Sequence, residues 1–190
     1  MSNFFNLENP FFQVMSKICD MLLISIVYLV LCIPIITIGP ASTALYYTMV
    51  KVIRRERGYV FREFFRSFKL NFKRGAIVGI LFLIVLFILG IDLAYAWGLA
   101  QSDSNKGSLL LGIFIGIGFL FICFSVYVFP ILSRFDMTVK NLIMTALYMS
   151  TRYIYFTVLM VVVYAAAAVI TYFVPPFIFI APATTVLINS

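Results

Sequence analysis

Long apolar runs separated by short polar segments dominate the pattern of the chain. Met21 to Ile33 is apolar except for Ser25, and runs of similar character recur three more times. Because about 20 apolar residues cross the ~30 Å hydrocarbon core of a bilayer as a helix, each run predicts a membrane span. The expected spans are residues 16–36, 75–98, 109–132 and 153–174, with a short final one at 177–189. The pattern therefore predicts an all-α fold: a single polytopic membrane helix bundle over residues 1–190, with five or six spans.

The first apolar stretch is too long for one span. Met21 to Val50 covers 30 residues, or about 45 Å at ~1.5 Å per residue. A broken-helix turn at Pro34, Thr37, Gly39 and Pro40 divides it, since proline and glycine interrupt helices, and we expect the two helices to join at 37–40. The helix that follows, within residues 41–57, either crosses as a short span or lies at the membrane interface, and both alternatives stay open.

Other prolines and glycines lie in the later spans, where they can end a helix, kink it or allow another helix to pack closely. Pro130 should end or kink the helix over 109–132, and Pro175 with Pro176 should end the helix over 153–174. Residues 177–189 then form either a thin span or a re-entrant end. Gly112 and Gly116 make a G-x-x-x-G pair, which makes close packing of another helix against that face possible.

Positive charge is concentrated in one segment. Residues 51–74 hold nine of the fourteen Lys and Arg residues of the chain, and residues 134–152 form a second basic stretch. Cytoplasmic segments next to membrane spans carry an excess of Lys and Arg. Both basic segments are therefore expected on the cytoplasmic side, whereas the nearly neutral residues 99–108 should form a loop outside. The side on which the N-terminus lies stays open.

The basic segment also has helical periodicity. Five phenylalanines between residues 61 and 72 recur at spacings of three and four, so a helix over 59–74 has an aromatic face and a cationic face. Besides orienting the bundle, such a helix can attract anionic lipid headgroups, at about 1 kcal/mol per basic residue, or dock a protein partner through aromatic and arginine anchors. The candidate docking residues are Arg54, Arg55, Arg57, Arg62, Phe64, Phe65, Arg66, Phe68, Lys69, Phe72 and Lys73.

Composition narrows the classes of function. The chain is 64% hydrophobic and 11% charged, against about 25% charged in soluble domains. Its net charge of +7 is explained by segments that flank spans, so nucleic-acid binding is not expected. There is no histidine, no phosphate-binding loop and no paired nucleophile and base, and the only acids near the spans, Asp20 and Asp92, lie at span ends. We therefore expect no catalytic, cofactor-binding or metal-binding residue, and no enzyme.

Residues 34–75 carry a family resemblance. The string PIITIGPASTALYYTMVKVIRRERGYVFREFFRSFKLNFKRG is similar to the hallmark of the YesL-like family of bacterial membrane proteins, a domain of unknown function. The matching positions are Pro34, Thr37, Gly39, Ala44, Leu45, Tyr46, Phe64, Phe65, Ser67, Phe68, Lys69, Asn71, Phe72 and Lys73, and more weakly Phe135 with Asp136. The resemblance implies a multi-pass protein of the bacterial plasma membrane.

Two functional hypotheses follow. Because relatives of this kind tend to be encoded beside carbohydrate ABC import systems, the resemblance implies a non-enzymatic accessory or regulatory partner of such an importer, with its permease subunits as the candidate partners. The alternative is a small solute or lipid carrier whose site is the broken-helix turn at residues 34–40, because broken helices in transporters expose backbone groups to ligands. The solute and the oligomeric state stay open.

Overall fold

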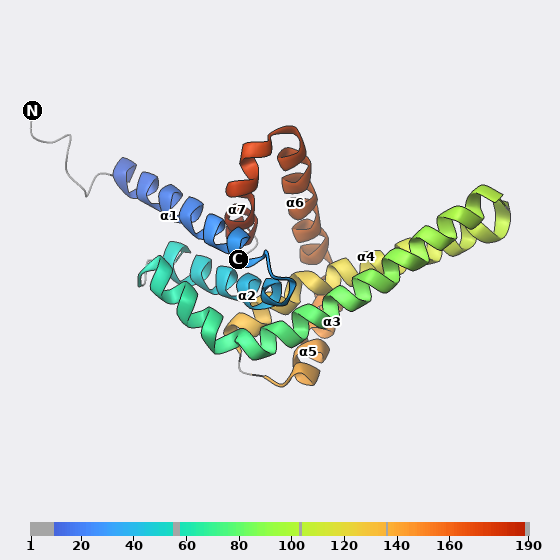
Figure 1. Cartoon of the computed structure of the whole chain (residues 1–190), viewed down its shortest axis with the longest axis horizontal. Helices are drawn as coiled ribbons and strands as arrows, with labels where there is room; N and C mark the ends of the chain where they lie inside the picture. Colours follow the sequence, from blue (N-terminus) through green and yellow to red (C-terminus); the bar gives the residue numbers. More distant parts are fainter. Residues whose placement is uncertain (1–9, 55–57, 103, 136, 189–190) are drawn as a thin grey trace, which may run out of the picture.

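The structure, a computed structural model, describes residues 10–54, 58–102, 104–135 and 137–188, and within these ranges it is helical and contains no strand (Figure 1). The elements are α1 (Pro10–Leu31), η2 (Ile35–Thr37), α2 (Ile38–Thr48), η3 (Met49–Arg54), α3 (Val60–Ser102), α4 (Ser104–Arg134), α5 (Val139–Arg152), α6 (Ile154–Phe173), η4 (Pro175–Phe179) and α7 (Ala181–Ile188). The expectation of an all-α fold is confirmed.

Among the residues that the structure describes, three helices are long and apolar enough to cross a membrane: Val60–Gln101, Lys106–Arg134 and Ile154–Phe173. Large apolar side chains on all three are exposed, among them Phe87, Leu120 and Phe156. Lipid tails can cover such a surface, whereas water would penalise it. The helices are therefore compatible with a membrane bundle, and the count of five or six spans stays a prediction.

The first apolar stretch does divide into two helices, but earlier than predicted. Helix α1 ends at Leu31, the single turn η2 follows Pro34, and α2 already begins at Ile38. Pro40 is thus the third residue of α2, where its missing N–H costs nothing because the first four amides of a helix lack partners within it. The expected join at 37–40 is wrong, and the break falls at residues 32–34.

Helix α3 is longer than the pattern suggested. The expected amphipathic helix over 59–74 and the expected span over 75–98 belong to one helix of 43 residues, whose two parts run in different directions (Figure 1). Gly58, with a φ of 92°, provides the turn before it. The expected loop at 99–108 is also mostly helical, since α3 reaches Ser102 and α4 begins at Ser104.

Prolines had different effects in different helices. Helix α4 continues through Pro130 to Arg134, so of the two predicted effects of Pro130, an end or a kink, the end is excluded. The predicted end at Pro175 is confirmed, because α6 stops at Phe173. The following α7 has only 8 residues, about 12 Å of helix. It packs back beside α1 and α6 with Ala183 and Val186 buried (Figure 1).

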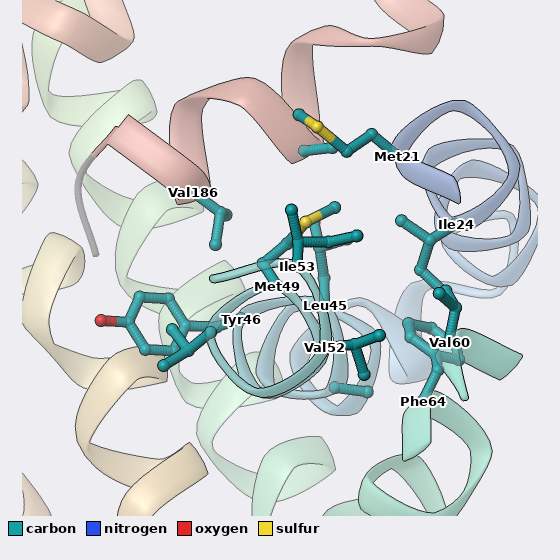
Figure 2. Close-up of a cluster of buried hydrophobic side chains, with 13 residues drawn as sticks. Met21, Ile24, Leu45, Tyr46, Met49, Val52, Ile53, Val60, Phe64 and Val186 are labelled. Carbon is teal, nitrogen blue, oxygen red and sulfur yellow. The ribbon is translucent and has the colours of Figure 1, made fainter. Parts of the chain in front are cut away.

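The main hydrophobic core surrounds α2 and η3. Leu45, Met49 and Ile53 project from this central helix toward side chains of α1, the start of α3 and α7 (Figure 2). A second cluster joins α3, α4 and α5 through Val78, Val128, Ile131, Leu132, Leu142 and Ala146. Helix α2 and η3 therefore form the central element, against which α1, the start of α3 and α7 pack.

Candidate functional site

Helices α2 and α3 make their closest approach at three glycines. A Cβ atom on Gly39 would lie 2.0 Å from the carbonyl oxygen of Gly75, and one on Gly75 would lie 2.8 Å from the nitrogen of Pro40. A Cβ on Gly79 would lie 3.1 Å from the Cα of Gly39. Only glycine allows the two backbones to come this close, as at small-residue contacts between membrane helices.

The predicted glycine contact on α4 is not present in the same form. Cβ atoms built on Gly112 and Gly116 would meet nothing within 4 Å among the described residues. Both glycines lie on an exposed face of α4. No described helix therefore uses this pair for the close packing that it allows, and the close contact occurs instead at Gly75-x-x-x-Gly79 of α3.

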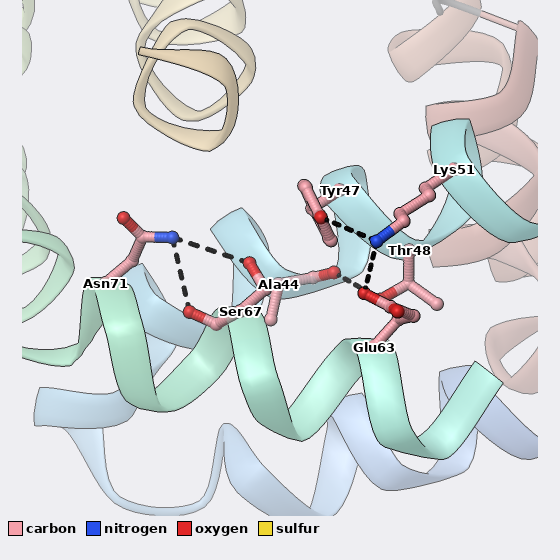
Figure 3. Close-up of polar contacts among 7 residues, drawn as sticks. All are labelled: Ala44, Tyr47, Thr48, Lys51, Glu63, Ser67 and Asn71. Atoms are coloured by element: carbon pink, nitrogen blue, oxygen red, sulfur yellow. Dashed lines mark hydrogen bonds and ion pairs between the residues drawn. The ribbon is translucent and has the colours of Figure 1, made fainter. Parts of the chain in front are cut away.

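A salt bridge fixes the other end of the same helix pair. Lys51 Nζ lies 2.7 Å from Glu63 Oε2 and donates a second bond to the Tyr47 hydroxyl at 3.0 Å (Figure 3). Glu63 is buried, with a side chain 10% exposed against 30% for Lys51. The hydrogen bonds to Glu63 and Tyr47 raise the pKa of Lys51, so its ammonium stays charged at neutral pH.

The glycine contact and the salt bridge lie at the two ends of one antiparallel helix pair, which we call the seam. On α2 and η3 the seam residues are Gly39, Thr43, Tyr47 and Lys51, and on α3 they are Glu63, Ser67, Asn71, Gly75 and Gly79. Each set repeats every four residues, and residues four apart share one face of a helix. Twelve residues separate the glycine contact from the salt bridge on both helices. The register of α3 against α2 is therefore fixed at both ends.

The seam gives α3 a third face that sequence reasoning missed. At ~100° per residue, the aromatic side chains lie between the buried polar stripe and the cations. Phe64 is fully buried and Phe68 is half-buried, whereas Phe61, Phe65 and Phe72 are exposed. The signal was present in the sequence as the spacing of Glu63, Ser67, Asn71 and Gly75, which is regular and polar or small throughout.

The predicted docking residues therefore separate by exposure. Phe65, Phe72, Arg54, Arg62, Arg66, Lys69 and Lys73 are exposed, whereas Phe64 is in the core and Phe68 is packed against it. Arg55 and Arg57 lie outside the described residues. We call the exposed set Phe61, Arg62, Phe65, Lys69 and Phe72 the α3 outer face. It combines aromatic area with positive charge, the composition that is enriched in binding hot spots.

The broken-helix turn is stabilised internally. The Thr37 hydroxyl donates to the carbonyl oxygens of Leu31 and Pro34. One helical turn later, Ser42 and Thr43 donate to the carbonyls of Ile38 and Gly39 at 2.8 and 2.9 Å. Pro34 is exposed, and Gly39 and Pro40 are buried in the contact with α3. The role of these residues as a ligand site stays a prediction.

A large cavity lies on the other side of α2. Its volume is about 830 Å³, and its walls come from α1, α2, α4, α6 and α7. The lining is mostly small or apolar, including Ala165, Ala168 and Pro182. Residues with hydroxyl groups are also among those that line it: Tyr28, Ser42, Ser125, Tyr164, Thr171 and Thr185. None of Pro34, Thr37, Gly39 and Pro40 lines this cavity.

Within the described part of the chain, no three His, Cys, Asp or Glu side chains come together in a way that could hold a metal ion. The chemistry available at the seam and the cavity is therefore hydrogen bonding, charge and apolar contact.

These features define an α-helical protein with helices of membrane-spanning length and a basic segment fixed to its core by the seam. Residues 21–93 match a family described as a protein of unknown function, DUF624. The chain is 31% identical over 84 residues to the uncharacterized protein YesL of Bacillus subtilis, covering 44% of this chain and 37% of YesL. It is 30% identical over 139 residues to the uncharacterized protein YteU of the same organism, covering 73% of this chain and 61% of YteU.

The domain match and the similarity to these two proteins support a YesL-like DUF624 family for this chain. The matched region includes both helices of the seam, with the glycine contact and the Lys51–Glu63 salt bridge. The matches span 37% and 61% of the lengths of YesL and YteU. No solved structure matches the chain.

Proposed function

We propose that this chain is a non-enzymatic, multi-pass protein of the bacterial plasma membrane that acts as an accessory or regulatory partner of a carbohydrate ABC importer. The observation that carries the proposal is the α3 outer face, where Phe61, Phe65 and Phe72 are exposed beside Arg62 and Lys69. Three exposed aromatic rings need apolar cover that water does not supply, and the adjacent cations add electrostatic selectivity for an acidic partner surface.

Two features support placing this face at the cytoplasmic side. The basic stretches 51–74 and 134–152 meet in the fold, because the end of α4 at Arg134 lies against α3 near Arg74. The apolar part of α3 leads away from them with α4 as a long hairpin (Figure 1). One membrane face can therefore take both basic segments, as the positive-inside rule requires.

The seam supports a docking role because it makes the outer face rigid. Its residues Glu63 and Ser67 are buried on the same helical turns as the exposed anchors Phe61, Arg62 and Phe65, and Phe64 is buried beside them. Rigid presentation reduces the conformational entropy lost on binding.

If the α3 outer face docks a permease subunit, reversing its charges should reduce the amount of permease that co-purifies with the protein. We expect R62E/K69E to reduce co-purification of the neighbouring permease subunits at least about tenfold, because two attractive charge contacts become repulsive. The measurement is recovery of permease from detergent extracts of cells that express both proteins. The variant K106E/K140E reverses two exposed lysines outside the outer face and should recover as much permease as the wild type.

A variant that changes no charge distinguishes a loss of docking from a change in membrane orientation. F61A/F65A/F72A leaves every charge in place and should lose the permease to a similar degree, while its protease accessibility from each side of the membrane stays unchanged. Full permease recovery by both variants, with normal orientation, would refute docking through this face.

The 830 Å³ cavity favours a second candidate, a small solute or lipid carrier. Its volume lies within the range of small-molecule sites, and its sparse hydroxyls can orient a ligand. Because a side chain at Gly39 would collide with α3, substitution in the broken-helix turn would not distinguish transport from misfolding, and a cavity variant is a better test.

The carrier hypothesis predicts transport by the purified chain alone. Liposomes containing it should move a labelled oligosaccharide or a fluorescent phospholipid, and A168W, which fills the cavity, should abolish the movement. A166W, on the same helix but outside the lining, should leave the rate within about twofold of wild type. Equal activity of both tryptophan variants, or none in the wild type, would exclude the cavity as a transport site.

A further inference from the structure

Helix α5 has three sides with different surroundings, and it lies between the end of α4 and the start of α6 (Figure 1). Leu142 and Ala146 are buried in the second hydrophobic cluster, with side chains of α3 and α4. A polar side is formed by Asn141, Thr145 and Arg152. The remaining side is apolar and exposed, and we call it the α5 outer side: Ile143, Met144, Leu147 and Tyr148. Residues four or seven apart share one side of a helix, so each set is continuous along α5.

The α5 outer side is far more exposed than an apolar surface in water should be. Met144 is 62% exposed and Leu147 is 50% exposed, whereas Leu142 on the buried side is 1% exposed. Four large apolar side chains next to one another are unfavourable in water, and a contiguous patch of this kind marks a surface that something apolar covers.

The exposed surface of α6 continues the α5 outer side. Tyr153, Tyr155 and Phe156 follow it in the chain and are also exposed. The helix Ile154–Phe173 is of membrane-spanning length, and so is Lys106–Arg134, which precedes α5. Helix α5 is therefore joined at both ends to helices whose exposed apolar side chains lipid can cover, and the same bilayer can cover the α5 outer side.

The polar groups beside the α5 outer side fit the boundary between lipid and water. The Arg152 Cζ atom lies 5.6 Å from the centre of the Tyr148 ring and 5.8 Å from that of Tyr153, and the guanidinium donates to the Tyr148 hydroxyl. Tyrosine rings and long cationic side chains are enriched at the level of lipid headgroups. The Thr151 hydroxyl donates to the carbonyls of Leu147 and Tyr148, so its proton is already bonded within the helix.

We propose that α5 lies along the surface of the phospholipid bilayer, with the α5 outer side inserted about 5–10 Å into the boundary between headgroups and acyl chains. The polar side then faces water, and the buried side holds the end of α4. Lys140 begins the outer side, and its aliphatic stem can lie along the apolar residues while its ammonium reaches the headgroups. The inference rests on the multi-pass membrane placement proposed above, but it does not require a permease partner.

The test measures which side of α5 phospholipid reaches, with the full chain in phosphatidylcholine nanodiscs that leave both membrane faces open. W97F removes the single tryptophan of the chain, and M144W or N141W then places one on the outer or the polar side. Phosphatidylcholine brominated near the top of its acyl chains should quench M144W fluorescence by at least about half and N141W fluorescence by less than about a fifth, because only the outer side is inserted. Iodide in the water should quench the two variants in the opposite order.

A tryptophan in place of Phe87, which is exposed on the apolar part of α3, separates this inference from the membrane placement. Quenching of F87W but not of M144W by the brominated lipid would overturn the insertion of α5 alone, whereas quenching of neither would overturn the membrane placement as well. Equal quenching of M144W and N141W would overturn the proposal, since it requires two different sides. Shielding of M144W from both quenchers would show that protein, such as a second copy of the chain, covers the outer side, and would also overturn it.

A second measurement needs no substitution. Phosphatidylcholine with a diazirine on its acyl chain, activated by light in the same nanodiscs, should label Met144 and Leu147 at least about threefold more than Asn141 and Thr145, because acyl chains meet only the inserted side. Labelled residues are identified by tandem mass spectrometry. Labels on α3, α4 and α6 without any on α5 would contradict the proposal.

Discussion

Replacement of Gly39 by alanine should strongly destabilise the contact between α2 and α3 and lower the stability of the protein. The new Cβ would lie 2.0 Å from the Gly75 carbonyl oxygen, and both partners are backbone atoms that no rotamer change can move away. We expect a loss of about 3 kcal/mol or more, since overpacking costs rise when neighbours cannot shift. For a chain of this length that loss lowers the thermal midpoint in detergent by roughly 6–12 °C.

The control for this prediction is G112A. Gly112 is also a helical glycine in an apolar segment, yet a Cβ there meets nothing within 4 Å. Alanine favours a helix by up to ~1 kcal/mol over glycine, so G112A should match or slightly exceed the wild-type midpoint. If G39A and G112A unfolded at the same temperature, the close contact between α2 and α3 would be wrong.

Replacement of Lys51 by methionine should produce the second largest loss of stability among the variants predicted here. It leaves the Glu63 carboxylate buried beside α2 without its ammonium partner. Loss of one partner from a fully buried pair costs ~3–5 kcal/mol. Because the Lys51 side chain is 30% exposed, water screens part of this pair, and we expect about 2 kcal/mol, or roughly 4–8 °C in the thermal midpoint.

The double variant K51M/E63Q and the pH dependence test the cause. The double variant should recover part of the stability, because the amide removes the unpaired charge. The control K140M, at an exposed lysine, should change the thermal midpoint little.

The hydrogen bonds that raise the pKa of Lys51 set the pH dependence. The contribution of Lys51 to stability is complete below the ordinary lysine pKa and is lost as pH rises through the higher pKa of the folded state. The difference in thermal midpoint between wild type and K51M should therefore be constant near pH 7 and shrink in strong alkali. If the losses of stability caused by K51M and E63Q simply added in the double variant, that result would contradict the Lys51–Glu63 salt bridge.

Much of the fold was predictable because the membrane imposes simple length and polarity rules. The apolar runs that became parts of α3, α4 and α6 were recognisable from composition alone. Pro175 ended α6 as predicted, since two adjacent prolines remove two amide donors. Pro130 did not end α4, because a long apolar helix retains enough hydrogen bonds and packing around one proline to continue.

The contacts between helices could not be predicted in the same way. Gly112-x-x-x-Gly116 and Gly75-x-x-x-Gly79 look alike in the sequence, yet only the second lies against another helix in the described chain. Which pair is used depends on how α2 and α3 align, and Lys51 with Glu63 fixes that alignment at the far end. The spacing of Glu63, Ser67, Asn71 and Gly75 was visible, but the phenylalanines around it suggested two faces instead of three.

The pocket between α3 and the end of α4 also depended on tertiary structure. Arg134 lies sixty residues after Arg74 in the sequence, and only the antiparallel packing of α3 and α4 brings them to one pocket. Charge counting identified both segments as basic and predicted that they lie on the same side of the membrane. It did not indicate that their side chains share a site.

Contact between the α3 outer face and the importer is the central claim, and photo-crosslinking tests it most directly. A photoreactive phenylalanine analogue in place of Phe65 should give a crosslinked product with a permease subunit in cells that express both proteins. The same analogue in place of Phe87, exposed on the apolar part of the same helix, should give little or none. A permease product of equal yield at both positions, or at neither, would contradict docking through the outer face.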